Sequence, residues 1–290
     1  MSYRPKLTHA SRPLTFTVPA INEHGERIET EIAGEGPLTL YVDKREIVTL
    51  MTLGAAPEAL AIGYLRNQRL LTSIEQIAAV QVDWETEAVA VTTRDGIKSP
   101  AKDLNKRLGK RTVTTGCGQG TVFGDLMEDI DNIHLPKNTT LDESTLQTLL
   151  DNVRVYDSLY KKAGALHGCA LASNTGNDAG KILYYVEDVG RHNAVDAIAG
   201  MMWLDNIGGS DKIFYTTGRL TSEMVIKAAQ MRIPFLVSRS GLTRMGWEIA
   251  NRVGMTMIGR SQGRHFLIFN GAEHFIASPK THPKPEVSEV

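Results

Sequence analysis

Short runs in which apolar and polar residues alternate fill the first hundred positions of the chain, and Gly and Pro separate them. Such runs are typical of β-strands with tight connections. One helix is expected to interrupt them, because Pro57 stands at a first-turn position and Leu60, Tyr64 and Leu65 follow at helical spacing up to about residue 70. Strands are predicted at residues 14–18, 27–32, 38–42, 46–51, 80–84 and 88–93.

The pattern changes after about residue 110, where strand-like and helix-like segments alternate. The capping box Thr140-x-x-Glu143 predicts the start of a helix whose apolar face continues to Tyr160 and which ends before Gly164. Alternation of this kind predicts an α/β layer structure with a largely parallel or mixed sheet. Strands are predicted at residues 167–172, 181–186, 212–216, 233–237, 255–258 and 266–269, and helices at 193–204, 221–231 and 243–251.

Two domains are therefore expected, an α+β domain at residues 1–110 and an α/β domain at 111–290. Between residues 100 and 111 the chain becomes basic and apolar residues thin out, which suggests a connector. The residues after about 278 are polar and rich in Pro, so the tail is expected to be disordered.

Composition and charge place the chain among ordinary globular proteins. Of its 290 residues, 42% are hydrophobic and 22% charged, which excludes collagen, coiled coil and general disorder. Lys and Arg total 32 against 33 for Asp and Glu, so no bulk binding of nucleic acid is expected. Without an apolar stretch of about 20 residues or a signal-peptide pattern, we expect a cytoplasmic protein without membrane contact.

The chain has two cysteines, Cys117 and Cys169, and a reducing compartment makes a structural disulfide between them unexpected. Cys117 lies between glycines in the segment Thr-Thr-Gly-Cys-Gly-Gln-Gly, which predicts a mobile, accessible loop at residues 114–122. Cys169 lies among small residues in a predicted strand and is expected to be buried.

Three strand-to-helix junctions, at residues 188–193, 217–222 and 238–243, each combine a glycine, an arginine and small polar side chains. Loops at the carboxyl ends of strands form the ligand crevice of α/β sheets, and helix N-termini together with Arg bind phosphate. The alternative is that the small side chains only cap helices and the arginines only carry surface charge. The candidate ligand residues here are Arg191, His192, Asn193, Arg219, Ser238, Arg239 and Ser240.

A fourth basic segment, at residues 260–265, is predicted to be a turn between the last two strands. Together with the junctions it suggests a site for a phosphate-rich ligand of nucleotide type. His167 and His192 are open to two interpretations, as acid–base groups beside a phosphate or as packing residues. The candidates in the fourth segment are Arg260, Ser261, Gln262, Gly263, Arg264 and His265.

Two more specific sequence motifs are incomplete in this chain. Gly241-x-x-x-x-Gly246 is followed by Trp247 rather than by Lys, so it is not a P-loop. His24-Gly25-Glu26 matches half of the zinc deaminase signature, but no Pro-Cys-x-x-Cys follows. We therefore expect no zinc or other structural or catalytic metal.

Taken together, five motifs resemble one family, the formate dehydrogenase accessory sulfurtransferases (FdhD/NarQ), from about residue 14 to residue 270. The resemblance implies a cytidine-deaminase-like α/β C-terminal domain behind the smaller α+β domain. It also implies a sulfur carrier that takes sulfur from a cysteine desulfurase as a persulfide. That sulfur passes to the molybdenum of bis(molybdopterin guanine dinucleotide), for which GDP is a mimic, before this cofactor enters formate dehydrogenase. The motifs are Thr-Gly-Cys-Gly at 115–118, His-Gly-Cys-Ala at 167–170, Asp-Val-Gly-Arg-His-Asn at 188–193, Thr-Gly-Arg-Leu-Thr-Ser at 217–222 and Ser-Arg-Ser-Gly-Leu-Thr at 238–243.

By position, Cys117 matches the family's persulfide cysteine and residues 260–265 match its guanine dinucleotide-binding segment. The resemblance also implies a homodimer. The chain departs from the family in one place, because many members read Cys-Gly-x-Cys in the loop and Gly120 stands at the second cysteine position here. A relay of two thiols within the loop is then excluded. Either Cys117 alone suffices, or the protein is an impaired homologue. The alternative function is a cofactor-binding chaperone for formate dehydrogenase maturation without sulfur transfer.

Overall fold

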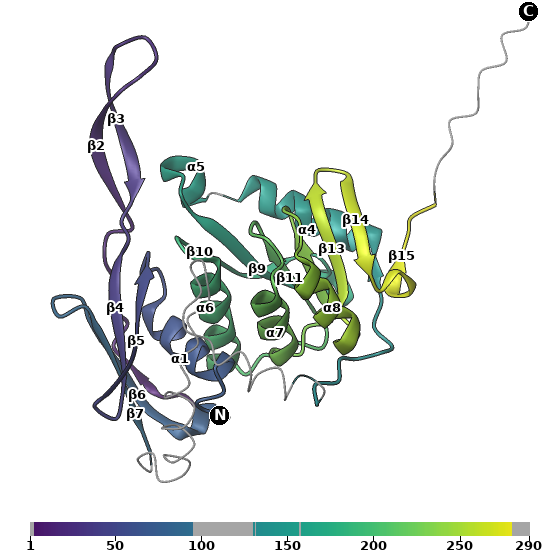
Figure 1. The fold of residues 1–290 in the computed structure, drawn as a ribbon, viewed down its shortest axis with the longest axis horizontal. Helices are drawn as coiled ribbons and strands as arrows, with labels where there is room; N and C mark the ends of the chain where they lie inside the picture. Colours follow the sequence, from purple (N-terminus) through teal and green to yellow (C-terminus); the bar gives the residue numbers. More distant parts are fainter. Residues whose placement is uncertain (1–2, 95–129, 131, 157, 280–290) are drawn as a thin grey trace, which may run out of the picture.

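The computed structural model describes residues 3–94, 130, 132–156 and 158–279. Two main sheets lie side by side, with helices between and around them (Figure 1). The expected mixture of strands and helices is confirmed.

The first sheet is built from the first hundred residues, as predicted. In β4 every second residue is buried, which is the alternation that the sequence shows. Helix α1 (Pro57–Asn67) begins at the predicted proline. Across the sheet the strands are β1 (Lys6–Leu7), β6 (Ile77–Asp83), β7 (Ala88–Thr93), β4 (Gly36–Val42) and β5 (Arg45–Thr52).

Two of the predicted strands stand apart from this sheet. β2 (Thr15–Ile21) and β3 (Arg27–Ala33) pair only with each other and form a hairpin that projects from the body of the molecule (Figure 1). A short 3-10 helix, η1 (Ile74–Gln76), precedes β6.

The second sheet has six strands and is mixed, as expected. β11, β12 and β13 are parallel to one another, whereas β9 and β14 are antiparallel to their neighbours. Across the sheet the strands are β10 (Ile182–Asp188), β9 (His167–Ser173), β11 (Lys212–Thr216), β12 (Phe235–Ser238), β13 (Thr256–Gln262) and β14 (His265–Asn270).

Helices cover both faces of the second sheet (Figure 1). One face carries α6 (Arg191–Leu204), α7 (Ser222–Gln230) and α8 (Arg244–Val253). The opposite face carries α4 (Glu143–Val155), followed by the short α5 (Leu159–Ala163). The remaining short elements are β8 (Leu141–Asp142), which pairs with β15 (Phe275–Ile276), and the 3-10 helices η2 (Gly176–Asp178) and η3 (Ala272–His274).

The helix predicted from Thr140 to Tyr160 is wrong in two respects. It starts later, since Asp142 is the N-cap residue, and the Glu143 carboxylate accepts a hydrogen bond from the Ser278 backbone N–H (2.8 Å) instead of closing a capping box. It also ends at Val155, so Tyr160 belongs to α5. Partners from distant parts of the chain override the local pattern.

The turn predicted at residues 260–265 is also shorter than expected. β13 continues through Gln262 and β14 begins at His265, so only Gly263 and Arg264 separate the two strands.

Helices α1 and α6 join the two halves of the molecule. A Cβ on Gly63 of α1 would lie 1.6 Å from the Asp196 carbonyl oxygen, and one on Gly200 of α6 would lie 1.9 Å from that of Ala59. Glycine at both positions lets the helix backbones touch. One apolar core then runs from the first sheet through α1 and α6 to the near face of the second sheet, and a second core lies under α4.

The predicted domain boundary and the cysteine loop at 114–122 lie outside the described residues, as does the chain beyond residue 279. The division into domains at 1–110 and 111–290 stays a prediction, as does the cytidine-deaminase-like character of the second.

Candidate functional site

The carboxyl ends of four strands meet along one edge of the second sheet. β11, β12 and β13 are parallel, and β10 points the same way because β9 is antiparallel to both β10 and β11. The three predicted junctions, at residues 188–193, 217–222 and 238–243, therefore follow one another along this edge, which we call the strand-end edge.

Buried hydroxyls hold the second and third junctions together. The Ser238 hydroxyl donates to the Gly218 carbonyl oxygen (2.6 Å) and accepts from the Ser240 backbone N–H (2.9 Å), while Thr216 Oγ1 accepts from the Gly218 N–H (3.1 Å). These contacts give Ser238 and the Ser240 backbone a structural role. Ligand contact by either residue stays a prediction.

In the first junction the side chains of His192 and Asn193 are buried and contact other protein groups. His192 Nε2 lies 2.9 Å from Glu223 Oε2, and both side chains are largely buried. Burial lowers the pKa of His192, although the Glu223 carboxylate acts in the opposite direction. Asn193 Nδ2 donates to Asp188 Oδ1 (2.8 Å) and to the Met51 carbonyl oxygen (2.7 Å).

Asp188 is the first residue of this junction, and the sequence analysis assigned it no role of its own. Its carboxylate accepts hydrogen bonds from the Gly190 N–H (3.0 Å), the Leu53 N–H (3.1 Å) and the Thr52 hydroxyl, so it links β10 to the first sheet. Burial raises the pKa of Asp188, and these hydrogen bonds offset part of the shift. Asp-x-Gly indicates a local turn, but no sequence signal marks the contact with Thr52 and Leu53.

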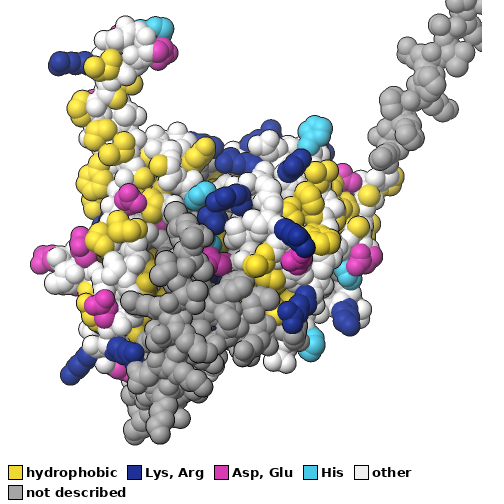
Figure 2. All heavy atoms as spheres, in the orientation of Figure 1, with side chains coloured by type: hydrophobic (Ala, Val, Ile, Leu, Met, Phe, Trp, Pro, Cys, Tyr) yellow, Lys and Arg dark blue, Asp and Glu magenta, His cyan; other side chains and the backbone are white. Residues whose placement is uncertain are grey.

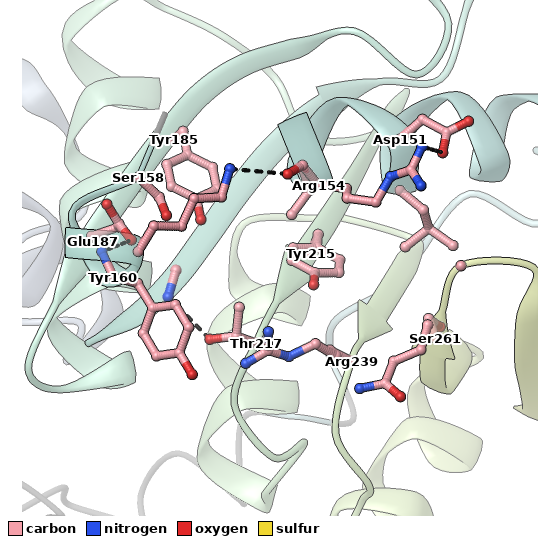
Figure 3. A pocket seen from close by; sticks show the side chains of 16 residues that line it. Asp151, Arg154, Ser158, Tyr160, Tyr185, Glu187, Tyr215, Thr217, Arg239 and Ser261 are labelled. Carbon is pink, nitrogen blue, oxygen red and sulfur yellow. Dashed lines mark hydrogen bonds and ion pairs between the residues drawn. The ribbon is translucent and has the colours of Figure 1, made fainter. Parts of the chain in front are cut away.

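A cavity of about 290 Å³ opens at the strand-end edge on the side of α4 and α5. In Figure 3, Arg239 lies between Tyr160 and Ser261, while Tyr215 and Thr217 face the same space. Of the predicted ligand residues, the cavity brings together Arg239, Ser261, Gln262 and Gly263. The others that the structure describes lie elsewhere along the edge or in the β13–β14 hairpin.

Ser261, in the cavity wall, carries a buried hydroxyl that has no hydrogen-bond partner in the described part of the chain. The residue is only 2% exposed, and its hydroxyl makes no hydrogen bond with any described residue. The preceding residue, Arg260, has φ 54° at an irregularity in the β13–β14 pairing, and its N–H donates to the Ser240 carbonyl oxygen (2.8 Å). Bulges of this kind re-aim side chains beside functional sites. A hydroxyl without a partner is suited to a ligand atom.

Tyrosines form much of the apolar wall. A Cβ on Gly168 would lie 2.4 Å from the Tyr185 hydroxyl oxygen, so glycine is needed where this ring crosses β9. Tyr156 stacks on Tyr185 with ring centroids 4.1 Å apart. Burial raises the pKa of Tyr215 to about 12, so its hydroxyl stays neutral and can donate a hydrogen bond. The sequence interpretation missed these tyrosines because it assigned them to core packing or to no site.

Glu187 fixes the position of α5 at the mouth of the cavity. Its carboxylate accepts hydrogen bonds from the backbone N–H groups of Leu159 (2.6 Å) and Tyr160 (3.1 Å) at the start of that helix. The Arg239 guanidinium lies over the Tyr160 ring, 5.6 Å from its centroid. Tyr160 therefore adds a flat aromatic surface next to a positive charge.

Positive charge gathers along this edge. The pKa of His167 is lowered by its burial and by the nearby charges of Arg191, Arg219 and Arg239. Arg191 is almost buried and packs its side chain against Gly218, where a Cβ would lie 2.7 Å from Arg191 Cδ. Figure 2 shows Lys and Arg side chains between α5 and the β13–β14 hairpin. The edge therefore attracts anions.

Cys169 is buried, as predicted. Its Sγ lies 3.3 Å from Thr216 Oγ1, and burial raises the pKa of the thiol to about 12. A thiol of this kind does not form a nucleophilic thiolate at neutral pH. Cys117, the predicted nucleophile, lies outside the described residues.

Among the described residues, no three His, Cys, Asp or Glu side chains are grouped to hold a metal ion. No helix in the described part of the chain is long and apolar enough to cross a membrane. Fold and site thus define an α/β protein with a basic, tyrosine-lined cavity at the strand ends.

Comparison with known proteins identifies the family. The model of the FdhD/NarQ family matches residues 33–276, and the chain belongs to this family. The match spans β4, β5, β6 and β7 of the first sheet and the whole strand-end edge.

Individual relatives agree with this result. The chain is 28% identical over 250 residues to the sulfur carrier protein FdhD of Listeria monocytogenes, covering 86% of this chain and 92% of the relative. The FdhD protein of Bacillus subtilis is 26% identical over 254 residues, with 87% and 93% covered. A crystal structure of a proposed formate dehydrogenase accessory protein from Desulfotalea psychrophila superposes with a TM-score of 0.71 at 25% identity, covering 91% of this chain and all of the other.

Proposed function

We propose that this chain is a sulfur carrier required for formate dehydrogenase activity and that Cys117 bears the sulfur as a persulfide. Membership of the FdhD/NarQ family and relatives named as sulfur carriers support the role. The observation that carries the proposal in this chain is the basic cavity at the strand-end edge. Its wall holds Arg239 and the Ser261 hydroxyl, which no described residue bonds.

In this proposal the cavity takes a guanine nucleotide portion of bis(molybdopterin guanine dinucleotide), the substrate that receives the sulfur. Arg239 contacts a phosphate, Ser261 and Gln262 offer polar groups, and the ring of Tyr160 provides a flat surface for a base. GDP presents the same base and phosphate groups. The cavity volume of about 290 Å³ suits part of such a ligand rather than all of it.

The sulfur step assigned to Cys117 is a thiol exchange. Its thiolate attacks the outer sulfur of a persulfide on a cysteine desulfurase; the new S–S bond forms as the old one breaks, and the desulfurase thiolate leaves. Delivery of that sulfur to molybdenum as sulfide consumes two electrons and restores the Cys117 thiolate. Because Gly120 replaces a second loop cysteine and Cys169 is buried, the two electrons in this scheme come from two external thiols, which are oxidised to a disulfide.

Gly120 also supports a second candidate function, a chaperone that holds the cofactor for formate dehydrogenase without moving sulfur. The cytoplasmic location, the homodimer and the cytidine-deaminase-like fold of the second domain belong to the main proposal. The homodimer and the deaminase-like fold rest on the family resemblance, and the cytoplasmic location rests on it together with the sequence pattern.

A crossed experiment with two variants tests the main proposal against the chaperone. Each protein is incubated with a cysteine desulfurase and cysteine, then assayed for sulfane sulfur by mass spectrometry and for GDP binding by calorimetry. Cys117→Ser is expected to lose all sulfane sulfur and to keep its GDP affinity. Arg239→Ala is expected to keep the persulfide and to lose about 1–3 kcal/mol of GDP binding, the range for charge-assisted hydrogen bonds.

Cys169→Ala is the matched control, because its thiol is buried, and it should load sulfur like the parent. Sulfane sulfur on the Cys117→Ser protein would reject Cys117 as the carrier, and absence of sulfane sulfur from the parent would favour the chaperone. Unchanged GDP affinity in Arg239→Ala would remove the cavity from the proposal.

A further inference from the structure

A second cavity, of about 350 Å³, lies at the opposite end of the helices from the strand-end edge. Its wall includes Arg66 near the end of α1, Trp203 near the end of α6 and Gln230 at the end of α7. We call it the rear cavity. The N-termini of α6 and α7 lie at the strand-end edge, and α6 has 14 residues, so about 20 Å of helix separates the two sites.

The rear cavity is positively charged. Arg66, Arg69 and Arg232 line it, and none of the described lining residues is acidic. The Arg66 guanidinium already contacts the protein on two sides. Its Nη1 donates to the Ala199 carbonyl oxygen (2.8 Å), and the group lies over the Trp203 ring, 5.2 Å from the ring centroid. Burial lowers the pKa of Arg66 to about 10, yet it stays charged at neutral pH.

Contacts with the described residues do not account for the side chains of Arg232 and Gln230. The Arg232 side chain is exposed and makes no hydrogen bond or ion pair with a described residue. Gln230 has both side-chain polar atoms, Nε2 and Oε1, buried without a hydrogen-bond partner in the described part of the chain. Arginines near helix C-termini can simply offset the helix dipole. A buried amide with neither donor nor acceptor satisfied is not explained in that way.

We propose that the rear cavity binds a small anion that carries phosphate groups. Arg232 contacts the phosphate oxygens, Arg69 adds positive charge to the cavity wall, and the Gln230 amide bonds a further polar atom of the ligand. Its volume lies in the range of sites for small ligands, and Trp203 and Leu71 give it an apolar wall. The site is separate from the proposed sulfur-transfer site and does not depend on it.

Calorimetric titration of the full chain with pyrophosphate and with ADP tests the proposal. Arg232 has φ 61°, so Arg232→Asn removes the guanidinium while keeping a residue that tolerates this backbone conformation. We expect at least a tenfold loss of affinity in Arg232→Asn and a weaker loss in Gln230→Leu. Arg252→Ala, on the exposed side of α8, is the control and should bind like the parent.

Comparing ADP with pyrophosphate shows whether the cavity recognises a nucleotide or phosphate groups alone. Tighter binding of ADP would assign a nucleotide, and equal binding would assign the phosphates alone; both agree with the proposal. Absence of binding to the parent, or the same affinity in Arg232→Asn and parent, would overturn it. Arg239→Ala, which alters the strand-end cavity, should leave the Arg232-dependent binding unchanged.

Discussion

At the scale of single residues, burial decides which groups along the strand-end edge can change charge. Cys169 and Tyr215 have pKa values raised to about 12, so both stay protonated at neutral pH. His192 shows the opposite direction, because burial favours its neutral form and lowers its pKa. Its protonation therefore opposes folding.

We predict that His192 contributes to a loss of stability in mild acid. The pKa of His192 is lower in the folded protein than in the unfolded chain. At a pH between these two pKa values the unfolded chain binds more protons than the folded protein. The free energy of unfolding therefore falls as the pH falls through this range. Thermal melts of the parent between pH 7.5 and pH 5.5 should show a decreasing midpoint, and the decrease should be smaller in His192→Gln. His265→Gln, at an exposed histidine, should follow the parent. Equal slopes in parent and His192→Gln would contradict the prediction.

At the scale of elements, the crossing of α1 over α6 connects the two halves most closely. Next to the glycine contacts, Asn67 Nδ2 donates to Asp196 Oδ1 (2.7 Å), and Lys227 Nζ lies 2.7 Å from Asp196 Oδ2 in a fully buried ion pair. Polar groups this deep in the core are tolerated because each charge has a partner. The crossing thus has both a close backbone contact and a specific polar contact.

We predict that Gly63→Ala destabilises the protein by about 3 kcal/mol or more, because overpacking a tight contact forces the backbone to move. The added Cβ would lie 1.6 Å from the Asp196 carbonyl oxygen, and a helix backbone cannot give way as a flexible side chain can. Urea titration measures the change. Gly208→Ala is the control, because a Cβ there meets nothing within 4 Å, and it should change stability by less than about 0.5 kcal/mol. If both variants unfold at the parent's midpoint, the close approach of the two helices is wrong.

At the scale of the whole molecule, the two predicted domains share one core. Apolar residues of the first sheet, of α1 and of α6 belong to the same buried cluster as the near face of the second sheet. Two carboxylates of the second half accept hydrogen bonds from the first half. Asp188 accepts from Thr52 and Leu53, and Asp196 accepts from Asn67. Neither half is complete without the other.

We predict that the full chain unfolds in a single calorimetric transition and that a chain starting at residue 95 does not fold. Removal of residues 1–94 would expose the α6 surface that α1 covers and leave two buried carboxylates without these donors, at a cost comparable to the stability of a whole domain. Circular dichroism of the shortened chain during heating provides the test. A cooperative melt of that chain, or two separate transitions in the parent, would contradict this prediction.

The sequence by itself determined the elements and much of the chemistry of this protein. Alternation predicted β4 and β7, Pro57 marked the start of α1, and the glycine–arginine junctions were placed correctly at strand ends. These signals are local: periodicity reports which side of an element is buried, and a short motif reports its own turn.

Only the tertiary structure decided which of those residues share a site. It placed Arg239 and Ser261 in one cavity with Tyr160, while it turned His192 and Asn193 inward. It also divided the helix predicted at 140–160 into two, and it paired the Glu143 carboxylate with the Ser278 N–H, 135 residues away. Side-chain direction at the end of a strand depends on bulges and on contacts between distant segments, which no local pattern encodes. The cavity therefore results from packing between the sheet and the helices on its two faces, whereas the sequence predicted its residues only individually.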